Sequence, residues 1–395
     1  MPRLINAYIF KELAVPFFLA VAILTLAALL GRTIKIVELV LNHGVGIGFV
    51  FWFILSLLPP FLVYTLPLSF LAAILITFAR LSYDNEITAM KAAGISLYSL
   101  MRPVLALALL VYAITLFISL YLYPWGNINA KRLLFDVART KTLSAIEEKT
   151  FYDNFKGVVM YVDRIPPGMD AVEGVFILER AETGGTSIIF AEKGMFIESA
   201  KELSVTLRLF NGALHRKGGQ KDKDYHILGF KTYQITLDLE GGVVKDVLSR
   251  SNKELYLTEL IRKIASSRSM GENTTGYVLD LNKRFALPAA VFVFALLGVP
   301  MGLQRVRSAR LVGFTMALFV ALVYYTLSKT LEALGKAGTL NPVVSVWAVD
   351  IVMAGAGFYM LSRAAKDAPI VMIARFEKAM SKIFDRLNTF FTSSG

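Results

Sequence analysis

The sequence of 395 residues contains no cysteine, which excludes disulfide bonds, thiol catalysis and cysteine-ligated metal sites. Its three histidines, His43, His215 and His226, do not have the spacing of a metal site. The nucleotide-binding pattern G-x-x-x-x-G-K-[ST] is also absent, because a suitably spaced glycine pair is followed by Tyr277 instead of lysine. No catalytic constellation is visible. We therefore expect a chain that is not an enzyme and holds no cofactor of its own.

Charged residues are scarce: they make up 18% of the chain, against about 25% in a typical soluble protein. Hydrophobic residues make up 55%. Several runs are long and nearly uncharged, as needed to cross a hydrocarbon core with ~20 residues each. They predict a polytopic α-helical membrane protein with six transmembrane helices, at residues 13–31, 49–79, 103–123, 285–303, 311–328 and 340–361.

The first two runs need separate interpretation. Residues 13–31 are longer than the core of a signal peptide and lack a small-x-small cleavage site, so they predict a retained span. Residues 49–79 contain Pro59, Pro60 and Pro67 and predict one bent or tilted helix. A pair of re-entrant half-helices is the alternative.

Positive charge predicts the orientation. The net charge of +12 is concentrated around the apolar runs, as expected for loops held at a negative inner membrane face and not for nucleic-acid binding. Loops on the side of the N-terminus are rich in lysine and arginine. The short loops on the other side carry Arg32, Lys35, Lys329 and Lys336. Both termini are thus expected in the cytoplasm of a bacterial inner membrane protein, and the long middle segment in the periplasm.

The middle segment has a different pattern. Short stretches rich in β-branched and aromatic residues alternate with turn residues, and they predict an inserted all-β periplasmic domain, a sandwich or jelly roll. The flanking residues 127–147 and 254–268 are expected to be helical. The predicted strands are 158–162, 175–178, 187–190, 203–209 and 233–239. The predicted parts of the chain are a membrane half (1–123), the β domain with its connectors (124–284), a second membrane half (285–362) and a basic cytoplasmic tail (363–395).

The inner loop at about residues 80–102 predicts a short helix. Asp84 is its expected N-cap, Glu86 lies in its first turn, where negative charge suits the helix dipole, and Gly94 offers a left-handed stop. The helix is either an extension of the third span or a coupling helix that docks on a cytoplasmic motor. Its expected apolar face consists of Leu81, Met90 and Ala93.

At this helix the sequence NEITAMKAAGIS (85–96) resembles the coupling helix of the lipopolysaccharide-export permease family LptF/LptG. Similar likenesses are YPW (123–125), LNKRFALP (281–288), LLGVPMG (296–302) and NPVVSVWAVD (341–350). The β domain is similar only in layout and in FKTYQITLDL (230–239). The residues after span three and before span four resemble the LptF branch more than the LptG branch. Asp350 departs from the family pattern, which usually has asparagine there.

The resemblance implies a permease subunit of an ABC-type exporter that extracts lipopolysaccharide from the inner membrane's outer leaflet. It implies a heterodimer with an LptG-like permease, an LptB-like ATPase dimer that binds ATP and Mg, an LptC-like membrane protein and a periplasmic LptA-like bridge. Asp84, Glu86 and Met90 would couple the chain to the ATPase. Arg32 and Lys35 share a helix face at the outer end of span one, where they either anchor the helix in the interface or bind lipid phosphates.

Other interpretations stay open. The chain is alternatively the LptG half of the same complex, or a membrane subunit that transmits mechanical force from an ATPase and passes no lipid. Arg284 is expected to pack or to anchor the middle domain. Gly298 and Gly302 form a G-x-x-x-G pattern that suits close helix packing, although Pro300 between them is a possible helix end.

Overall fold

A computed structural model of the chain describes residues 2–43, 47–144, 148–155, 158–166, 171–180, 186–199, 204–217, 225–237, 252–303 and 309–366. The chain divides into two compact units. One unit comprises Met1–Thr33, Leu57–Gly126 and Asn252–Gly395, and the other comprises Ile34–Ser56 and Asn127–Ser251.

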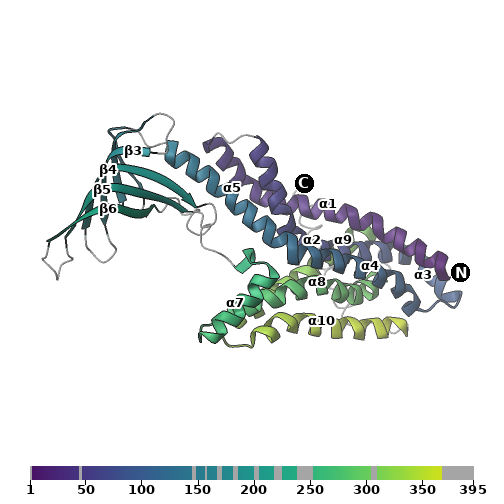
Figure 1. The fold of residues 1–395 in the computed structure, drawn as a ribbon. Helices are drawn as coiled ribbons and strands as arrows, with labels where there is room; N and C mark the ends of the chain where they lie inside the picture. Colours follow the sequence, from purple (N-terminus) through teal and green to yellow (C-terminus); the bar gives the residue numbers. More distant parts are fainter. Residues whose placement is uncertain are drawn as a thin grey trace, which may run out of the picture. The chain divides into compact units, whose positions relative to one another are not determined.

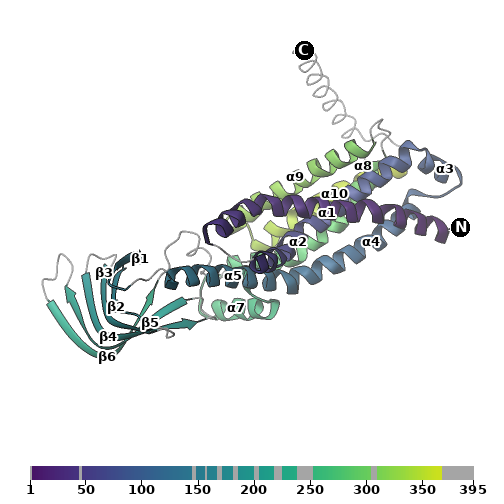
Figure 2. The ribbon, with the colours of Figure 1, turned by 90° about the horizontal axis from the view of Figure 1, so that it is seen from above.

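The first unit is built from long helices that lie alongside one another (Figures 1 and 2). A π-helical segment, Ile118–Leu122, joins α4 to α5, and a 3-10 turn, Asn252–Glu254, precedes α7. The helices described in the chain are α1 (Pro2–His43), α2 (Ile47–Tyr83), α3 (Glu86–Ala92), α4 (Leu97–Phe117), α5 (Tyr123–Ser144), α7 (Leu257–Ser269), α8 (Thr275–Gly302), α9 (Ala309–Lys336) and α10 (Pro342–Ala365). Residues 34–43 of α1, 47–56 of α2 and 127–144 of α5 belong to the second unit.

Six helices in the described part of the chain are long and apolar enough to cross a membrane, which confirms the predicted number. These candidate spans are Leu4–Gly31, Gly48–Tyr83, Leu97–Asp136, Thr275–Gly302, Phe314–Lys336 and Pro342–Ala365. The second is a single continuous helix that contains Pro59, Pro60 and Pro67, so the re-entrant alternative is wrong. The predicted ends of the third and fifth spans, at residues 123 and 328, lie too early in the chain, because both helices continue through polar residues.

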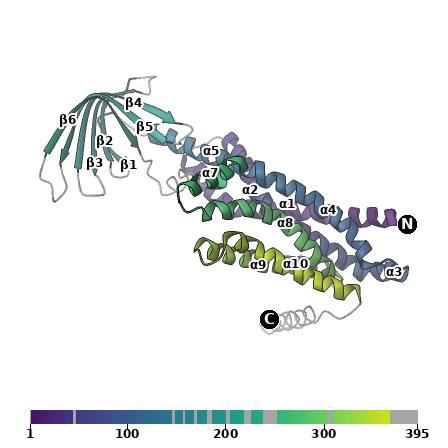
Figure 3. The same ribbon diagram turned by 60° about the horizontal axis from the view of Figure 1, so that its bottom comes forward.

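The second unit contains a single curved antiparallel sheet (Figures 2 and 3). Each described strand pairs only with its neighbours in sequence, in the order β1-β2-β3-β4-β5-β6. The all-β prediction is confirmed, and the described strands form a meander without the crossover connections of a jelly roll. The strands are β1 (Phe151–Phe155), β2 (Val158–Arg164), β3 (Ala171–Arg180), β4 (Thr186–Ser199), β5 (Ser204–Lys217) and β6 (Tyr225–Leu237).

The sheet buries one face. Val158, Met160 and Val162 alternate along β2 with less buried residues, and Ile177 and Ile189, paired across β3 and β4, are both fully buried. This period of two is the pattern that predicted the strands. Phe135 of α5 packs into the same apolar cluster. The predicted helical connectors are confirmed as α5 and α7.

The two membrane halves meet where α2 and α4 pack against α8. Gly298 and Gly302 make this close approach possible, because a Cβ at Gly298 would lie 2.9 Å from Ile74 Cγ2 and one at Gly302 would lie 2.7 Å from Phe78 Cβ. The G-x-x-x-G pattern therefore marks a packing surface. Pro300 lies inside α8 and does not end it.

Gly302→Ala is expected to destabilise the protein. The added Cβ would overlap Phe78 where the backbone of α2 lies 3.5 Å away and has little room to yield, and overpacking of this kind costs about 1–3 kcal/mol. The thermal unfolding midpoint of the protein in lipid nanodiscs measures the effect. Gly355→Ala is the matched control, because a Cβ there would meet nothing within 4 Å. Equal midpoints for both variants would contradict the packing role.

Candidate functional site

The two ends of the helical unit carry different polar clusters. The end at α3 also holds the C-terminal ends of α2 and α8, since Ser82 Oγ of α2 donates to the Leu303 carbonyl at 2.6 Å. Helix α8 therefore begins at the opposite end and runs toward α3, and α9 ends where α8 begins, because Lys283 pairs with Glu332. Lys283, near the start of α8, and Glu332, near the end of α9, are therefore at the end opposite α3.

The α3 helix begins differently from the prediction. Asn85, with φ 60°, is its N-cap residue, and no side chain caps the helix, so the predicted cap at Asp84 is wrong. The backbone turns here through the left-handed region, which asparagine tolerates better than most residues. The exposed Asp84 precedes the cap. Glu86 does lie in the first turn, and Gly94 has φ +83°, as its predicted role as a stop requires.

The apolar face of α3 is also corrected. Ile87, with 5% exposure, is the buried residue of the helix, while Ala93 is exposed. Ile87 joins the same apolar cluster as the fully buried Leu81, and the partly buried Met90 packs against that cluster. The helix is thus anchored by Ile87 and Met90. The prediction missed Ile87, and it included Leu81, which belongs to α2 and not to this helix.

Helix α1 is tied to α2 and α3 by polar contacts. The Tyr8 hydroxyl donates to Glu86 Oε2 at 2.8 Å. Four residues on, Glu12 accepts an ion pair from Arg80 at 2.7 Å, and its carbonyl accepts from Thr77 Oγ1 at 3.1 Å. Glu86 is therefore positioned by α1 as well as by its own helix. Sequence reasoning missed this connection, because Tyr8 and Glu86 are 78 residues apart.

At the opposite end, Glu332 is surrounded by lysines. Its Oε1 accepts from Lys283 at 2.9 Å and from Lys336 at 3.0 Å, and its Oε2 accepts from Lys329 at 3.1 Å. Lys283 also lies 3.7 Å from Asp280. The sequence placed Lys329 and Lys336 on the outer side, but it gave no sign that Lys283 and Glu332 meet.

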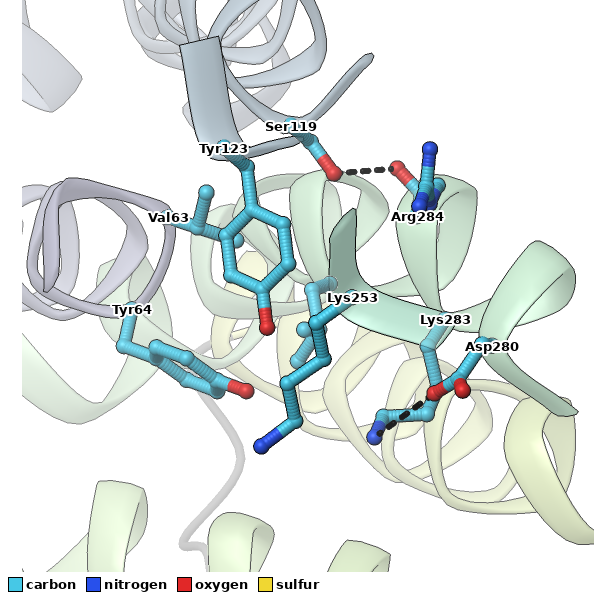
Figure 4. A pocket seen from close by; sticks show the side chains of 9 residues that line it. Val63, Tyr64, Ser119, Tyr123, Lys253, Asp280, Lys283 and Arg284 are labelled. Atoms are coloured by element: carbon cyan, nitrogen blue, oxygen red, sulfur yellow. Dashed lines mark hydrogen bonds and ion pairs between the residues drawn. The ribbon is translucent and has the colours of Figure 1, made fainter. Parts of the chain in front are cut away.

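Two small cavities, each of about 30 Å³, lie beside Lys283. Around the first one, Tyr64, Tyr123 and Lys253 surround the Lys283–Asp280 pair (Figure 4). The second is lined by Lys329, Glu332 and neighbouring side chains, among them Tyr324 and Ser328. Both have room for about one water molecule.

Arg284 anchors the connector that leads into α8. Its side chain is buried, and Nη2 donates to the carbonyls of Leu255 at 2.5 Å and Asn252 at 3.3 Å. Its own carbonyl accepts from Ser119 at 3.1 Å (Figure 4). The expected packing and anchoring role therefore matches the contacts.

Asp350 is buried in α10 with 5% exposure, and its Oδ1 accepts from the Tyr324 hydroxyl of α9 at 2.7 Å. Tyr325 beside it donates to the Tyr64 carbonyl of α2 at 2.9 Å. These two tyrosines tie α9 to α10 and α2. The contact gives Asp350 a structural partner that the sequence did not reveal.

The remaining predicted binding residues cannot be placed in a site. Arg32 and Lys35 fall in α1, but their side chains lie outside the described residues. The part of the predicted cytoplasmic tail beyond Lys366 also lies outside the described residues. In the described part, no group of three or more His, Cys, Asp or Glu residues is arranged to hold a metal ion.

Arg284→Met is expected to loosen the connector at residues 252–256. Methionine fills similar space but cannot donate to the two carbonyls, and hydrogen bonds from a charged donor are worth about 1.5–3 kcal/mol. Hydrogen exchange should become faster in this segment. Arg262→Met, on the exposed surface of α7, is the control and should leave the exchange unchanged. Equal protection in both variants would show that Arg284 does not hold the connector.

Comparison with known proteins gives a consistent result. A family model described as lipopolysaccharide export system permease LptF/LptG matches residues 7–363. Lipopolysaccharide export system permease protein LptF of Escherichia coli (strain K12) is 23% identical over 292 residues, which cover 73% of this chain and 75% of that protein. The protein of the same name from Shigella flexneri gives the same values. An uncharacterized protein of Rickettsia prowazekii (strain Madrid E) is 26% identical over 153 residues, 39% of this chain and 42% of that protein.

Proposed function

Because the chain belongs to the lipopolysaccharide export permease family LptF/LptG, we propose that it is the LptF-type membrane subunit of an ABC-type exporter. In this proposal it extracts lipopolysaccharide from the outer leaflet of the inner membrane and passes it to a periplasmic bridge. The observation that carries the proposal is α3, a short helix anchored between two spans that presents Asp84 and Glu86 at one end of the bundle.

The chain would act as a non-catalytic subunit. It has no nucleotide-binding pattern, so an LptB-like ATPase dimer would bind ATP and Mg and supply the energy. The ATPase would dock on α3. Asp84 is exposed, Glu86 is partly exposed and hydrogen-bonded to Tyr8, and Met90 helps to fix the helix to the bundle. A rigidly anchored helix with acidic residues at its N-terminal end suits the transmission of force from a partner that carries complementary charge there.

The opposite end of the bundle would meet the lipid. Arg32 and Lys35 would hold phosphates at the rim, while the acyl chains enter laterally into a cavity between this chain and an LptG-like partner. Closure of the ATPase would collapse this cavity and move the lipid upward. Charge-assisted contacts from lysine and arginine to phosphate are stronger than neutral hydrogen bonds, which supports basic residues in this role.

The β domain would lie in the periplasm and receive the lipid. The described sheet has two edges, the five-residue β1 and the thirteen-residue β6. A sheet edge can be extended by a strand of another protein, so an LptC-like protein or an LptA-like bridge would pair there. With the N-terminus inside, both termini are cytoplasmic.

Two other functions would use the same fold. In the first, the chain is the paralogous LptG subunit of the same complex, and the same partners are expected. A subunit that transmits force without passing lipid predicts co-purification with an ATPase but no bound lipid A. Mass spectrometry of lipid retained by the gently purified complex distinguishes this last function from export.

Glu86→Lys is expected to uncouple the chain from the ATPase. In the reconstituted complex, ATPase turnover and lipopolysaccharide release should both fall about tenfold. A tenfold loss corresponds to about 1.4 kcal/mol of docking free energy. The reason is electrostatic: a lysine at this position of α3 would repel a partner surface whose positive charge complements Glu86. Asp163→Lys, at an exposed position on β2, is the charge-matched control. Normal lipid export by the Glu86→Lys complex would remove the coupling role.

The double variant Arg32→Glu and Lys35→Glu is expected to lower the amount of lipopolysaccharide retained by the purified complex. Its physical basis is repulsion between the new carboxylates and the lipid phosphates. Quantitative mass spectrometry of extracted lipid A measures the effect. Lys11→Glu, exposed near the other end of the same helix, is the control and should retain lipid normally. Unchanged retention in the double variant would assign Arg32 and Lys35 to interfacial anchoring.

A further inference from the structure

Asp350 is a carboxyl group inside a helix that is long and apolar enough to cross a membrane. Eight residues separate it from Pro342, the first residue of α10, which is about 12 Å of helix at 1.5 Å per residue. The residue is 5% exposed. A charged carboxylate is costly in such a place, and acids found there commonly have a function. An acid buried at this depth must therefore be neutral or be paired with a cation.

The surroundings of Asp350 supply one hydrogen bond. Its Oδ1 accepts from the Tyr324 hydroxyl of α9 at 2.7 Å. Its Oδ2 is buried and has no hydrogen-bond partner among the residues that the structure describes. Tyr324 is 2% exposed, and its ring packs against Phe294 of α8 in an apolar cluster that also contains Val349. The carboxyl group and the hydroxyl group therefore meet in apolar surroundings.

No charged side chain of the neighbouring helices reaches Asp350 in the part of the chain that the structure describes. Helices α4, α8 and α9 pack against α10. The titratable group next to Tyr324 is Tyr325, which donates to the Tyr64 carbonyl of α2. Arg284 of α8 donates to backbone carbonyls. Arg102 of α4 is exposed, and Arg363 lies in the last turn of α10. The other acids and lysines of α8 and α9 with described side chains pair with one another, namely Asp280, Lys283, Lys329, Glu332 and Lys336.

We propose that Asp350 is a proton-binding site, which joins α9 to α10 in its protonated form and releases the proton when the two helices separate. An ionised carboxylate accepts several hydrogen bonds in water, and Tyr324 replaces only one of them. A neutral carboxyl group keeps the same bond through its carbonyl oxygen and buries no charge, which costs far less free energy. This inference goes beyond the proposed function and does not depend on it.

The hydroxyl of Tyr324 gives the proton a route to water. Tyr324 and Ser328 line one of the small cavities beside Lys283, which has room for about one water molecule. A hydroxyl group both donates and accepts, so it can pass a proton between the carboxyl group and the cavity. Release converts the carboxylic acid into a carboxylate and transfers one proton to water. Asp350 can therefore exchange its proton without direct contact with the solvent.

The sign of the pH effect follows from the state that binds the proton. When α9 and α10 are paired, Asp350 holds a proton, and when they are separated and hydrated it gives that proton up at neutral pH. Equilibria shift toward the state with fewer bound protons as the pH rises. Acid therefore favours the pairing of α9 with α10, and alkali weakens it.

Infrared spectroscopy of the full chain in lipid nanodiscs tests the bound proton directly. A protonated carboxyl group has a C=O stretching band that a carboxylate does not have. Asp350→Asn should remove one such band at neutral pH, because the amide keeps the shape and the acceptor for Tyr324 but has no acid proton. Asp163→Asn, at an exposed position on β2, is the matched control and should leave the band unchanged. Tyr324→Phe should shift the band to higher frequency, since the C=O group then loses its hydrogen bond.

The thermal unfolding midpoint tests the release of the proton. As the pH rises from mildly acidic to mildly alkaline, the midpoint of the unmodified chain should fall relative to that of Asp350→Asn, which cannot ionise at this position. The Asp163→Asn chain should follow the unmodified one, because its exposed carboxyl group is ionised in both states.

Each outcome decides for or against the site. An unchanged carboxyl band in Asp350→Asn, or the same pH dependence of the midpoint in both chains, would mean that Asp350 is ionised in place and would overturn the proposal. If Asp350→Asn does not fold, the spectrum of Tyr324→Phe decides: a shifted band supports the site, and an unshifted band contradicts it. Neither measurement requires lipopolysaccharide or ATP, so failure of the proposed export function would leave these results unaffected.

Discussion

The close approach of α2 and α8 is the contact that brings the backbones of the two groups of spans together, and α4 packs against the same helix α8. Inside a membrane there is no hydrophobic force between helices, so association relies on van der Waals packing, and glycines bring the two backbones together. Gly298 and Gly302 face Ile74 and Phe78 in this contact. Because α2 and α8 belong to different halves of the sequence, their packing joins the two groups of three spans into one body.

The same pair of helices positions both polar clusters. At one end, the last turn of α2 leads directly into α3, and Ser82 binds the end of α8 through the Leu303 carbonyl. At the other end, Tyr64 of α2 lies beside Lys283 of α8 in the lining of both small cavities. Both polar clusters are therefore held by one shared scaffold of two helices.

Much of this architecture could be predicted from composition and period. Six apolar runs gave the spans, alternation gave five of the six described strands, and Gly94 gave the end of α3. The strand β1 was missed because Phe151–Phe155 is short and carries Asp153 and Asn154 in its centre. The cap at Asn85 was missed because it depends on a left-handed backbone angle and not on a side-chain contact. Pairs such as Tyr8–Glu86 and Lys283–Glu332 depend on tertiary packing, which one sequence does not encode in any local pattern.

The tie between Tyr8 and Glu86 has a thermodynamic consequence for how α1 and α3 respond to their surroundings. If a partner that binds α3 favours one position of α1, then a ligand that favours that position of α1 must strengthen the binding of the partner by the same factor. This reciprocity holds whichever event comes first in time. The hydroxyl of a single tyrosine therefore contributes to a free energy that the two helices share.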